Sequence, residues 1–187
     1  MVPEIWIAVS EKTAIKQLRL TTRDIPDYDL LMKGRLKILA EHNLGLAAIQ
    51  DVIGSLRPLE GAKAFLDELR SITQVIILSD TFEEFAKPLM KQLGWPTLLC
   101  HRLEVVDGKI VNYKLRINEQ KKEAVAALKS LRYKVIAAGD SFNDTAMLAE
   151  ADIGILFRAP EKIKEQFPQF PAVETYADLL QRIRKEL

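Results

Sequence analysis

The stretch that decides the fold is Val135-Ile136-Ala137-Ala138-Gly139-Asp140-Ser141-Phe142-Asn143-Asp144. Its apolar half predicts a buried strand that ends at Gly139, and its polar half predicts the first turn of a helix. Open α/β sheets bind ligands at the carboxyl ends of their strands, where Asp140, Asn143 and Asp144 would lie. Two carboxylates and an amide are hard oxygen ligands, so we predict Mg²⁺ held by Asp140 and Asp144. Mn²⁺ would satisfy the same ligands, and helix capping by Asp140 and Asn143 is the alternative.

Outward from this stretch, the residues after Pro58 alternate short apolar runs with segments of helical spacing. We predict strands at residues 75–78, 97–100, 134–138 and 153–157. Helices are expected at 61–70, after Thr81 to about residue 93, at 121–131, at 143–150 and from 177 onward. A β-hairpin over 103–115 would turn at Asp107-Gly108, a dipeptide that favours a type I′ turn. This alternation predicts an α/β fold with a doubly wound parallel, Rossmann-like sheet.

The residues before Pro58 have a different character, because apolar side chains recur there at helical spacing from about residue 4 to residue 56. We therefore divide the chain into an all-helical subdomain, residues 1–57, and an α/β core, residues 58–187.

Composition excludes several classes of protein. The formal net charge of the 187 residues is +1, which gives no basic field for nucleic acid. No apolar stretch is long enough to span a membrane, and the first residues do not resemble a secretory signal, so a cytoplasmic location is expected. The single cysteine, Cys100, excludes an internal disulfide and is predicted to be a buried, unreactive thiol.

Two further segments carry side chains that suit a phosphate. Ser79-Asp80-Thr81 follows an apolar run, and its hydroxyl and amide groups would donate to an anion at a helix N-terminus. An ordinary helix cap is the alternative. Lys121 opens the helix after the hairpin, where its charge opposes the helix dipole unless an anion lies nearby. A solvated lysine beside Lys122 is the alternative there.

In order along the chain, these segments resemble the second, third and fourth motifs of the haloacid dehalogenase-like phosphohydrolases. Within that superfamily the chain is most similar to the phosphoserine phosphatases, particularly the bifunctional phosphoserine phosphatase/homoserine phosphotransferase type. The stretches that carry this closer resemblance are residues 2–6, 22–29, 88–90 and 167–173.

The resemblance implies a Mg²⁺-dependent phosphatase of serine biosynthesis that acts on O-phosphoserine, a small phospho-amino acid, with water or homoserine as phosphoryl acceptor. The helical subdomain would form a cap over the site. The implied catalytic residues are Ser79, Lys121 and Asp140. The implied substrate-binding residues are Glu4 for the ammonium, Arg35 for the carboxylate, and Ser79, Asp80, Thr81 and Asn143. Whether two copies of the chain pair into a homodimer, through an edge strand or the hairpin, is left undecided by the sequence.

The family's nucleophile is an aspartate at the end of a first central strand, upstream of Glu4, and no acidic residue precedes Glu4. We therefore expect the nucleophile and the first central strand to be missing, the chain as written to be inactive, and its start to lie at an internal codon. A non-catalytic protein that binds a phospho-amino acid, or a truncated gene product, is the alternative. A phospho-receiver domain would also place acids at strand ends, but the helical residues 4–56 disfavour it.

Overall fold

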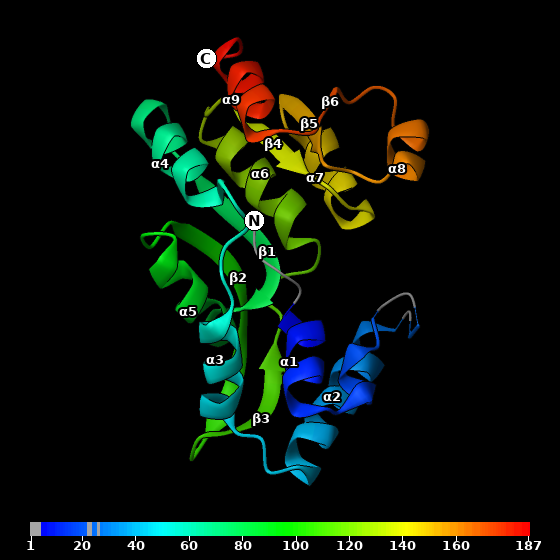
Figure 1. Cartoon of the computed structure of the whole chain (residues 1–187). Helices are drawn as coiled ribbons and strands as arrows, with labels where there is room; N and C mark the ends of the chain where they lie inside the picture. The colour runs from blue at the N-terminus through cyan, green and yellow to red at the C-terminus, as the bar shows by residue number, and fades with distance from the viewer. Residues whose placement is uncertain (1–4, 22–23, 26) are drawn as a thin grey trace. The chain divides into compact units, whose positions relative to one another are not determined.

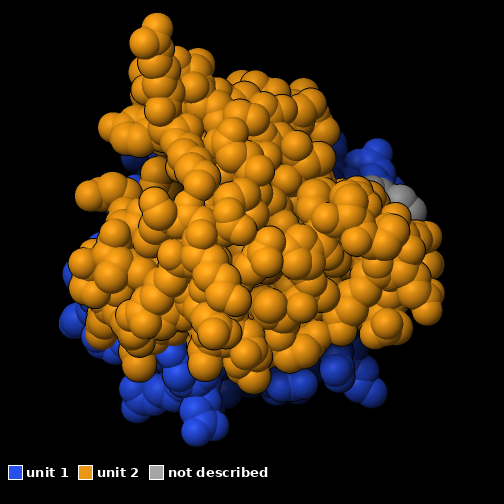
Figure 2. Space-filling view, turned by 90° about the horizontal axis from the view of Figure 1, so that it is seen from above, with its two compact units in different colours: residues 1–63, 79–116 blue, residues 64–78, 117–187 orange. Residues whose placement is uncertain are grey.

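The structure, a computed structural model, describes residues 5–21, 24–25 and 27–187 (Figure 1). The chain forms two compact units, coloured separately in Figure 2. Unit 1 comprises Met1–Lys63 and Ser79–Arg116, and unit 2 comprises Ala64–Leu78 and Ile117–Leu187. The predicted boundary between residues 57 and 58 stays a prediction. Within the described ranges, no helix has the length and apolar character needed to cross a bilayer.

Unit 1 begins with the helices expected from the sequence. They are α1 (Ile5–Thr13), the 3₁₀ helix η1 (Lys16–Arg19), α2 (Tyr28–Glu41) and α3 (Leu46–Ser55). The Asp27 carboxylate caps α2 by accepting the Leu30 N–H at 2.9 Å, and left-handed Asn43 follows its end. Their apolar sides form a core that includes Val9, Leu18, Leu31, Met32, Leu39, Ile49 and Ile53.

The rest of unit 1 is built on a hairpin. Strands β2 (Thr97–Val106) and β3 (Lys109–Lys114) pair antiparallel, and β1 (Ile76–Phe82), which belongs to unit 1 from Ser79 onward, neighbours β2. Asp107 and Gly108 both have positive φ, at 47° and 75°, which confirms the predicted turn. Two separately predicted strand segments, 97–100 and the first arm of the hairpin, form the single strand β2. Cys100 and His101, at the junction of the two segments, are buried within this strand.

Helix α5 (Glu83–Gln92) packs against β2 and α3 although it contains Pro88. A proline has no N–H, so the carbonyl four residues earlier in the helix loses its usual partner. That carbonyl belongs to Glu84, and the side-chain amide of Gln50 on α3 donates to it at 2.8 Å. The α3–α5 contact thus includes a side chain that replaces the missing backbone donor.

Unit 2 is an α/β unit with a parallel sheet in the order β4-β5-β6 (Figure 1). The strands are β4 (Ile136–Gly139), β5 (Ile153–Phe157) and β6 (Ala172–Val173). The helices are α4 (Ala62–Ile72), α6 (Gln120–Ser130), η2 (Phe142–Asp144), α7 (Thr145–Glu150), α8 (Glu161–Gln166) and α9 (Tyr176–Arg184). Helices α6 and α7 pack together, and α7 lies on β4 and β5. The core consists of Val125, Ala137, Met147, Leu148, Leu156, Ala159 and Ile163. The predicted α/β fold is confirmed.

Two features differ from the expected elements. Strand β1 does not end near Leu78 but continues through Ser79–Thr81 to Phe82, which is buried against Phe85. In the described part of the chain the strands form two sheets, with β1 and β4 as terminal strands. The expected loss of the first central strand stays a prediction. Cys100 is buried, and burial raises the pKa of its thiol to about 11, which confirms the predicted unreactive cysteine.

Candidate functional site

The candidate site in unit 2 starts where β4 ends at Gly139. The next residues turn back so that Asp144 closes onto the end of the strand. A Cβ atom at Gly139 would lie 2.4 Å from the Cβ of Asp144, so this approach requires glycine. Glycine at the end of the strand therefore allows one carboxylate to fold against the backbone of Asp140 and Ser141.

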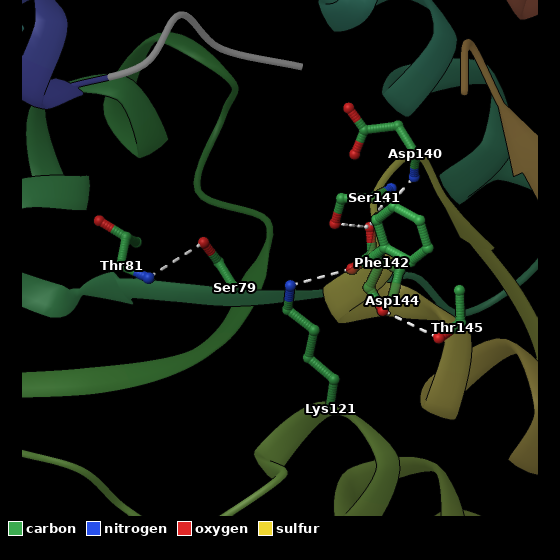
Figure 3. Close-up of polar contacts among 8 residues, drawn as sticks. All are labelled: Ser79, Thr81, Lys121, Asp140, Ser141, Phe142, Asp144 and Thr145. Atoms are coloured by element: carbon green, nitrogen blue, oxygen red, sulfur yellow. Dashed lines mark hydrogen bonds and ion pairs between the residues drawn. The ribbon is translucent and has the colours of Figure 1, made fainter. Parts of the chain in front are cut away.

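Asp144 uses both carboxylate oxygens (Figure 3). Its Oδ2 accepts the backbone N–H groups of Asp140 and Ser141, each at 3.0 Å, and the Ser141 hydroxyl at 2.8 Å. Its Oδ1 accepts from Nζ of Lys121 on α6 at 2.9 Å. Ser141 and Asp144 also form a capping box for η2. Ser141 is not singled out from sequence, although the Ser-x-x-Asp spacing resembles the known capping signature.

The Lys121–Asp144 pair is largely shielded, with side chains 14% and 10% exposed. Burial alone would raise the pKa of Asp144. The Lys121 ammonium and the hydrogen bonds from Ser141 outweigh burial, and the pKa lies below its usual value. Asp144 is therefore ionised, and its charge explains why a lysine is tolerated in the first turn of α6.

Asp140 has the opposite electrostatic environment. Desolvation, and then the negative charge of Asp144, raise the pKa of Asp140 above its usual value. In Figure 3 its carboxylate points away from the Asp144 network, and no dashed line reaches it. A carboxylate destabilised in this way gains most from a bound cation, because the cation offsets both effects.

The donor chemistry fits Mg²⁺. Among the described residues, no group of three or more His, Cys, Asp or Glu side chains surrounds a common point. Mg²⁺ does not require such a cage, because it keeps several waters and uses one or two carboxylates with substrate oxygens. Asp140 suits direct coordination, whereas both Asp144 oxygens already accept hydrogen bonds. Asn143 is exposed on η2 in the same loop. The predicted ligand pair stays a prediction.

The other predicted site residues lie in unit 1 or outside the described residues. Ser79, Asp80 and Thr81 are on β1, where the Thr81 N–H donates to Ser79 Oγ at 3.3 Å. The predicted placement of Ser79 at a helix N-terminus is wrong, because β1 runs on to Phe82 before α5 begins. Glu4 lies outside the described residues.

Arg35 is buried on α2. Its Nη2 donates to the Leu20 carbonyl at 2.7 Å, and its guanidinium lies 4.4 Å from the centre of the Trp6 ring. Burial raises the pKa of Tyr28 to about 12, with smaller opposing effects from the charges of Arg35 and Asp80. Arg35 and Asp80, both predicted to bind substrate, therefore act electrostatically on Tyr28. Tyr28 is not among the candidate site residues predicted from the sequence.

Comparison with known proteins identifies relatives among the phosphohydrolases. A family model described as haloacid dehalogenase-like hydrolase matches residues 5–152. The phosphoserine phosphatase ThrH of Pseudomonas aeruginosa is 62% identical over 186 residues, which cover 99% of this chain and 91% of that protein. A phosphoserine phosphatase of Pseudomonas syringae pv. tomato is 62% identical over 180 residues, covering 96% of this chain and 76% of that protein.

Solved structures show the same fold. A phosphoserine phosphatase in apo form superposes with a TM-score of 0.74 at 22% identity, covering 94% of this chain and 89% of that chain. A phospho-aspartyl intermediate analogue of phosphoserine phosphatase superposes with a TM-score of 0.76 at 20% identity, covering 97% and 92%.

Proposed function

Because the chain belongs to the haloacid dehalogenase-like hydrolases, in the branch of the phosphoserine phosphatases, we propose that it forms a Mg²⁺-dependent site for hydrolysis of O-phosphoserine. The observation that carries this proposal is the Lys121–Asp144–Ser141 network beside the Asp140 carboxylate, whose pKa burial and the Asp144 charge raise. The Lys121 ammonium on α6 and the Asp140 carboxylate at the end of β4 supply the two charges that binding of a phosphate together with a metal ion requires.

Each residue of this network has a distinct role in the proposal. Asp144 fixes the direction of the Lys121 side chain, so that the ammonium stabilises negative charge on the phosphoryl group as it transfers. Asp140 would hold the metal, with Asn143 beside it in the loop. When bound, Mg²⁺ supplies charge neutralisation at the phosphate oxygens. Ser141 holds Asp144 in place through its hydroxyl and its backbone N–H.

Unit 1 would supply recognition of the amino acid. We assign the substrate carboxylate to Arg35, whose planar guanidinium suits a bidentate carboxylate, and the ammonium to Glu4. The hydroxyl and backbone of Ser79 are assigned to the phosphate, with Asp80 and Thr81 beside them on β1. These assignments rest on the family resemblance.

The proposal also concerns which molecule accepts the phosphoryl group. One structural neighbour is a phospho-aspartyl intermediate analogue, and a covalent aspartyl-phosphate would allow either water or homoserine to take the phosphoryl group. The first aspartate of the 187 residues is Asp24. The aspartates on or directly after a described strand are Asp80, Asp107 and Asp140, and none of them is assigned as the nucleophile.

That observation favours a second candidate function, in which these 187 residues bind phosphoserine and Mg²⁺ without turnover. One experiment separates the two functions. The 187-residue chain is incubated with Mg²⁺ and ³²P-labelled O-phosphoserine, quenched in acid and examined for protein-bound label. Bound ligand with trapped label supports the phosphatase, and label that homoserine discharges as O-phosphohomoserine supports transfer. Ligand binding without trapped label supports the binder, whereas no phosphoserine binding rejects both functions.

A further inference from the structure

The segment 167–171, Phe-Pro-Gln-Phe-Pro, has no role in the proposed function, yet it contacts the loop that carries the candidate metal ligands. The rings of Phe142 and Phe167 meet edge to face, with centroids 6.1 Å apart and planes at 70°. The Phe167 and Phe170 rings are stacked, with centroids 6.3 Å apart and planes at 19°. We call Phe142, Phe167 and Phe170 the aromatic clamp. All three residues belong to unit 2.

One side of the aromatic clamp is fixed to the core. Phe167 and Phe170 are partly buried and pack against the apolar cluster of unit 2. The Phe167 N–H donates to the Ile163 carbonyl at the end of α8, at 3.0 Å. The Pro171 carbonyl accepts the Leu156 N–H of β5 at 2.9 Å. Two prolines further restrict the backbone of this segment, so it forms a rigid support.

The other side of the aromatic clamp is Phe142, which lies between Ser141 and Asp144 in the candidate site (Figure 3). Phe142 is 48% exposed, so solvent reaches part of its side chain. Its carbonyl accepts the Thr145 hydroxyl at 2.8 Å, and its ring rests on Phe167. The loop is thus held by polar bonds through Asp144 and, independently, by an aromatic contact.

We propose that the aromatic clamp is a positioning device for the metal: Phe142, acting through Phe167, holds residues 140–144 in the conformation that presents the Asp140 carboxylate to Mg²⁺. This inference rests on the proposed function. An aromatic pair of this kind contributes enough to change the population of a loop conformation by about two- to tenfold. Mg²⁺ affinity is reduced by the same factor when that population falls.

The test uses the full 187-residue chain and isothermal titration with MgCl₂. Phe142→Ala and Phe167→Ala should each weaken Mg²⁺ binding by about two- to tenfold. The double variant should lose no more than either single variant, because both changes remove one contact. Phe142→Tyr should restore binding, because it keeps the ring.

A matched control removes an aromatic contact elsewhere in unit 2. Phe65 stacks on Tyr176, with ring centroids 4.9 Å apart, and does not belong to the clamp. Phe65→Leu should lower the melting temperature and leave the Mg²⁺ dissociation constant unchanged. Equal Mg²⁺ affinities for Phe142→Ala and the wild type, or additive losses in the double variant, would overturn the positioning role.

A second readout needs no metal. Without Mg²⁺, the Ser141 amide should exchange with solvent about two- to tenfold faster in Phe142→Ala than in the wild type, because its bond to Asp144 opens more often. Unchanged exchange would overturn the inference. If the wild type fails to bind Mg²⁺, the metal part of the proposed function fails, and this exchange measurement still decides whether the clamp holds the loop.

Discussion

The Nζ atom of Lys121 lies 2.9 Å from Oδ1 of Asp144, and both side chains are largely shielded from water. Asp144 uses its other oxygen to hold the backbone of Asp140 and Ser141. One carboxylate thus links α6 to the loop after β4. The same residue that organises the candidate chemistry therefore also supports the fold around it.

Asp144→Asn should therefore destabilise the protein. Removing one partner of a shielded ion pair leaves the Lys121 charge poorly compensated, and we expect the free energy of unfolding to fall by about 3 kcal/mol. Urea denaturation measures this change. The control is Glu104→Gln, which breaks the exposed 2.9 Å pair with Lys114 and should lower stability far less, because water screens that pair. Similar losses in both variants would contradict a structural role for Asp144.

Asp140→Asn should have the reverse effect on stability. Desolvation and the charge of Asp144 disfavour ionised Asp140, but Asp140 is exposed and water screens these effects. A neutral amide should therefore leave stability unchanged or raise it slightly. The same variant should lose Mg²⁺ binding. Melting curves recorded with and without MgCl₂ check both points, because only the wild type should be stabilised by the metal. A variant that MgCl₂ still stabilises would exclude Asp140 as a ligand.

The side chain of Gln50 should stabilise the fold because Pro88 leaves the Glu84 carbonyl without its usual backbone donor. Gln50→Leu removes the donor to the Glu84 carbonyl and should lower the free energy of unfolding by about 1–2 kcal/mol. In a Pro88→Ala background the same change should cost less, since the alanine N–H then donates to that carbonyl. A double-mutant cycle measured by urea denaturation gives the coupling. Additive losses would show that Gln50 does not replace the missing backbone donor.

Arg35→Ala should weaken binding of O-phosphoserine much more than binding of phosphoethanolamine, which lacks the carboxylate. Losing a charged hydrogen-bonding partner should weaken phosphoserine binding by about tenfold or more. Competition titrations with the two ligands give the ratio of affinities, and circular dichroism verifies the fold of this buried position. Equal losses for both ligands would remove Arg35 from carboxylate recognition.

The sequence alone predicts much of the fold, and for physical reasons. The apolar run before Gly139 and the polar residues after it predict both β4 and the clustering of Asp140 with Asp144, because local patterning determines both. The Asp107-Gly108 turn is equally local. Strand β1 extends beyond its prediction because Phe82 is buried by tertiary contacts, which polar Ser79–Thr81 do not indicate.

Other features depend on contacts that sequence patterns do not encode. Helix α8 has six residues and β6 has two, too few to show a period. The aromatic clamp joins Phe142 to Phe167 across 25 positions of the chain, and the role of Gln50 depends on a proline in another helix. Ser141, which is also not predicted from the sequence, differs from these features because the Ser-x-x-Asp spacing of a capping box can be recognised in the sequence.

The central claim is that Lys121 and a metal at Asp140 together bind the phosphate of O-phosphoserine. The most direct measurement is calorimetric titration of the 187-residue chain with O-phosphoserine, with and without MgCl₂, alongside Lys121→Ala. The claim predicts binding that Mg²⁺ strengthens and that Lys121→Ala weakens by at least about tenfold. Binding of equal strength with and without Mg²⁺, unaffected by the loss of Lys121, would contradict it.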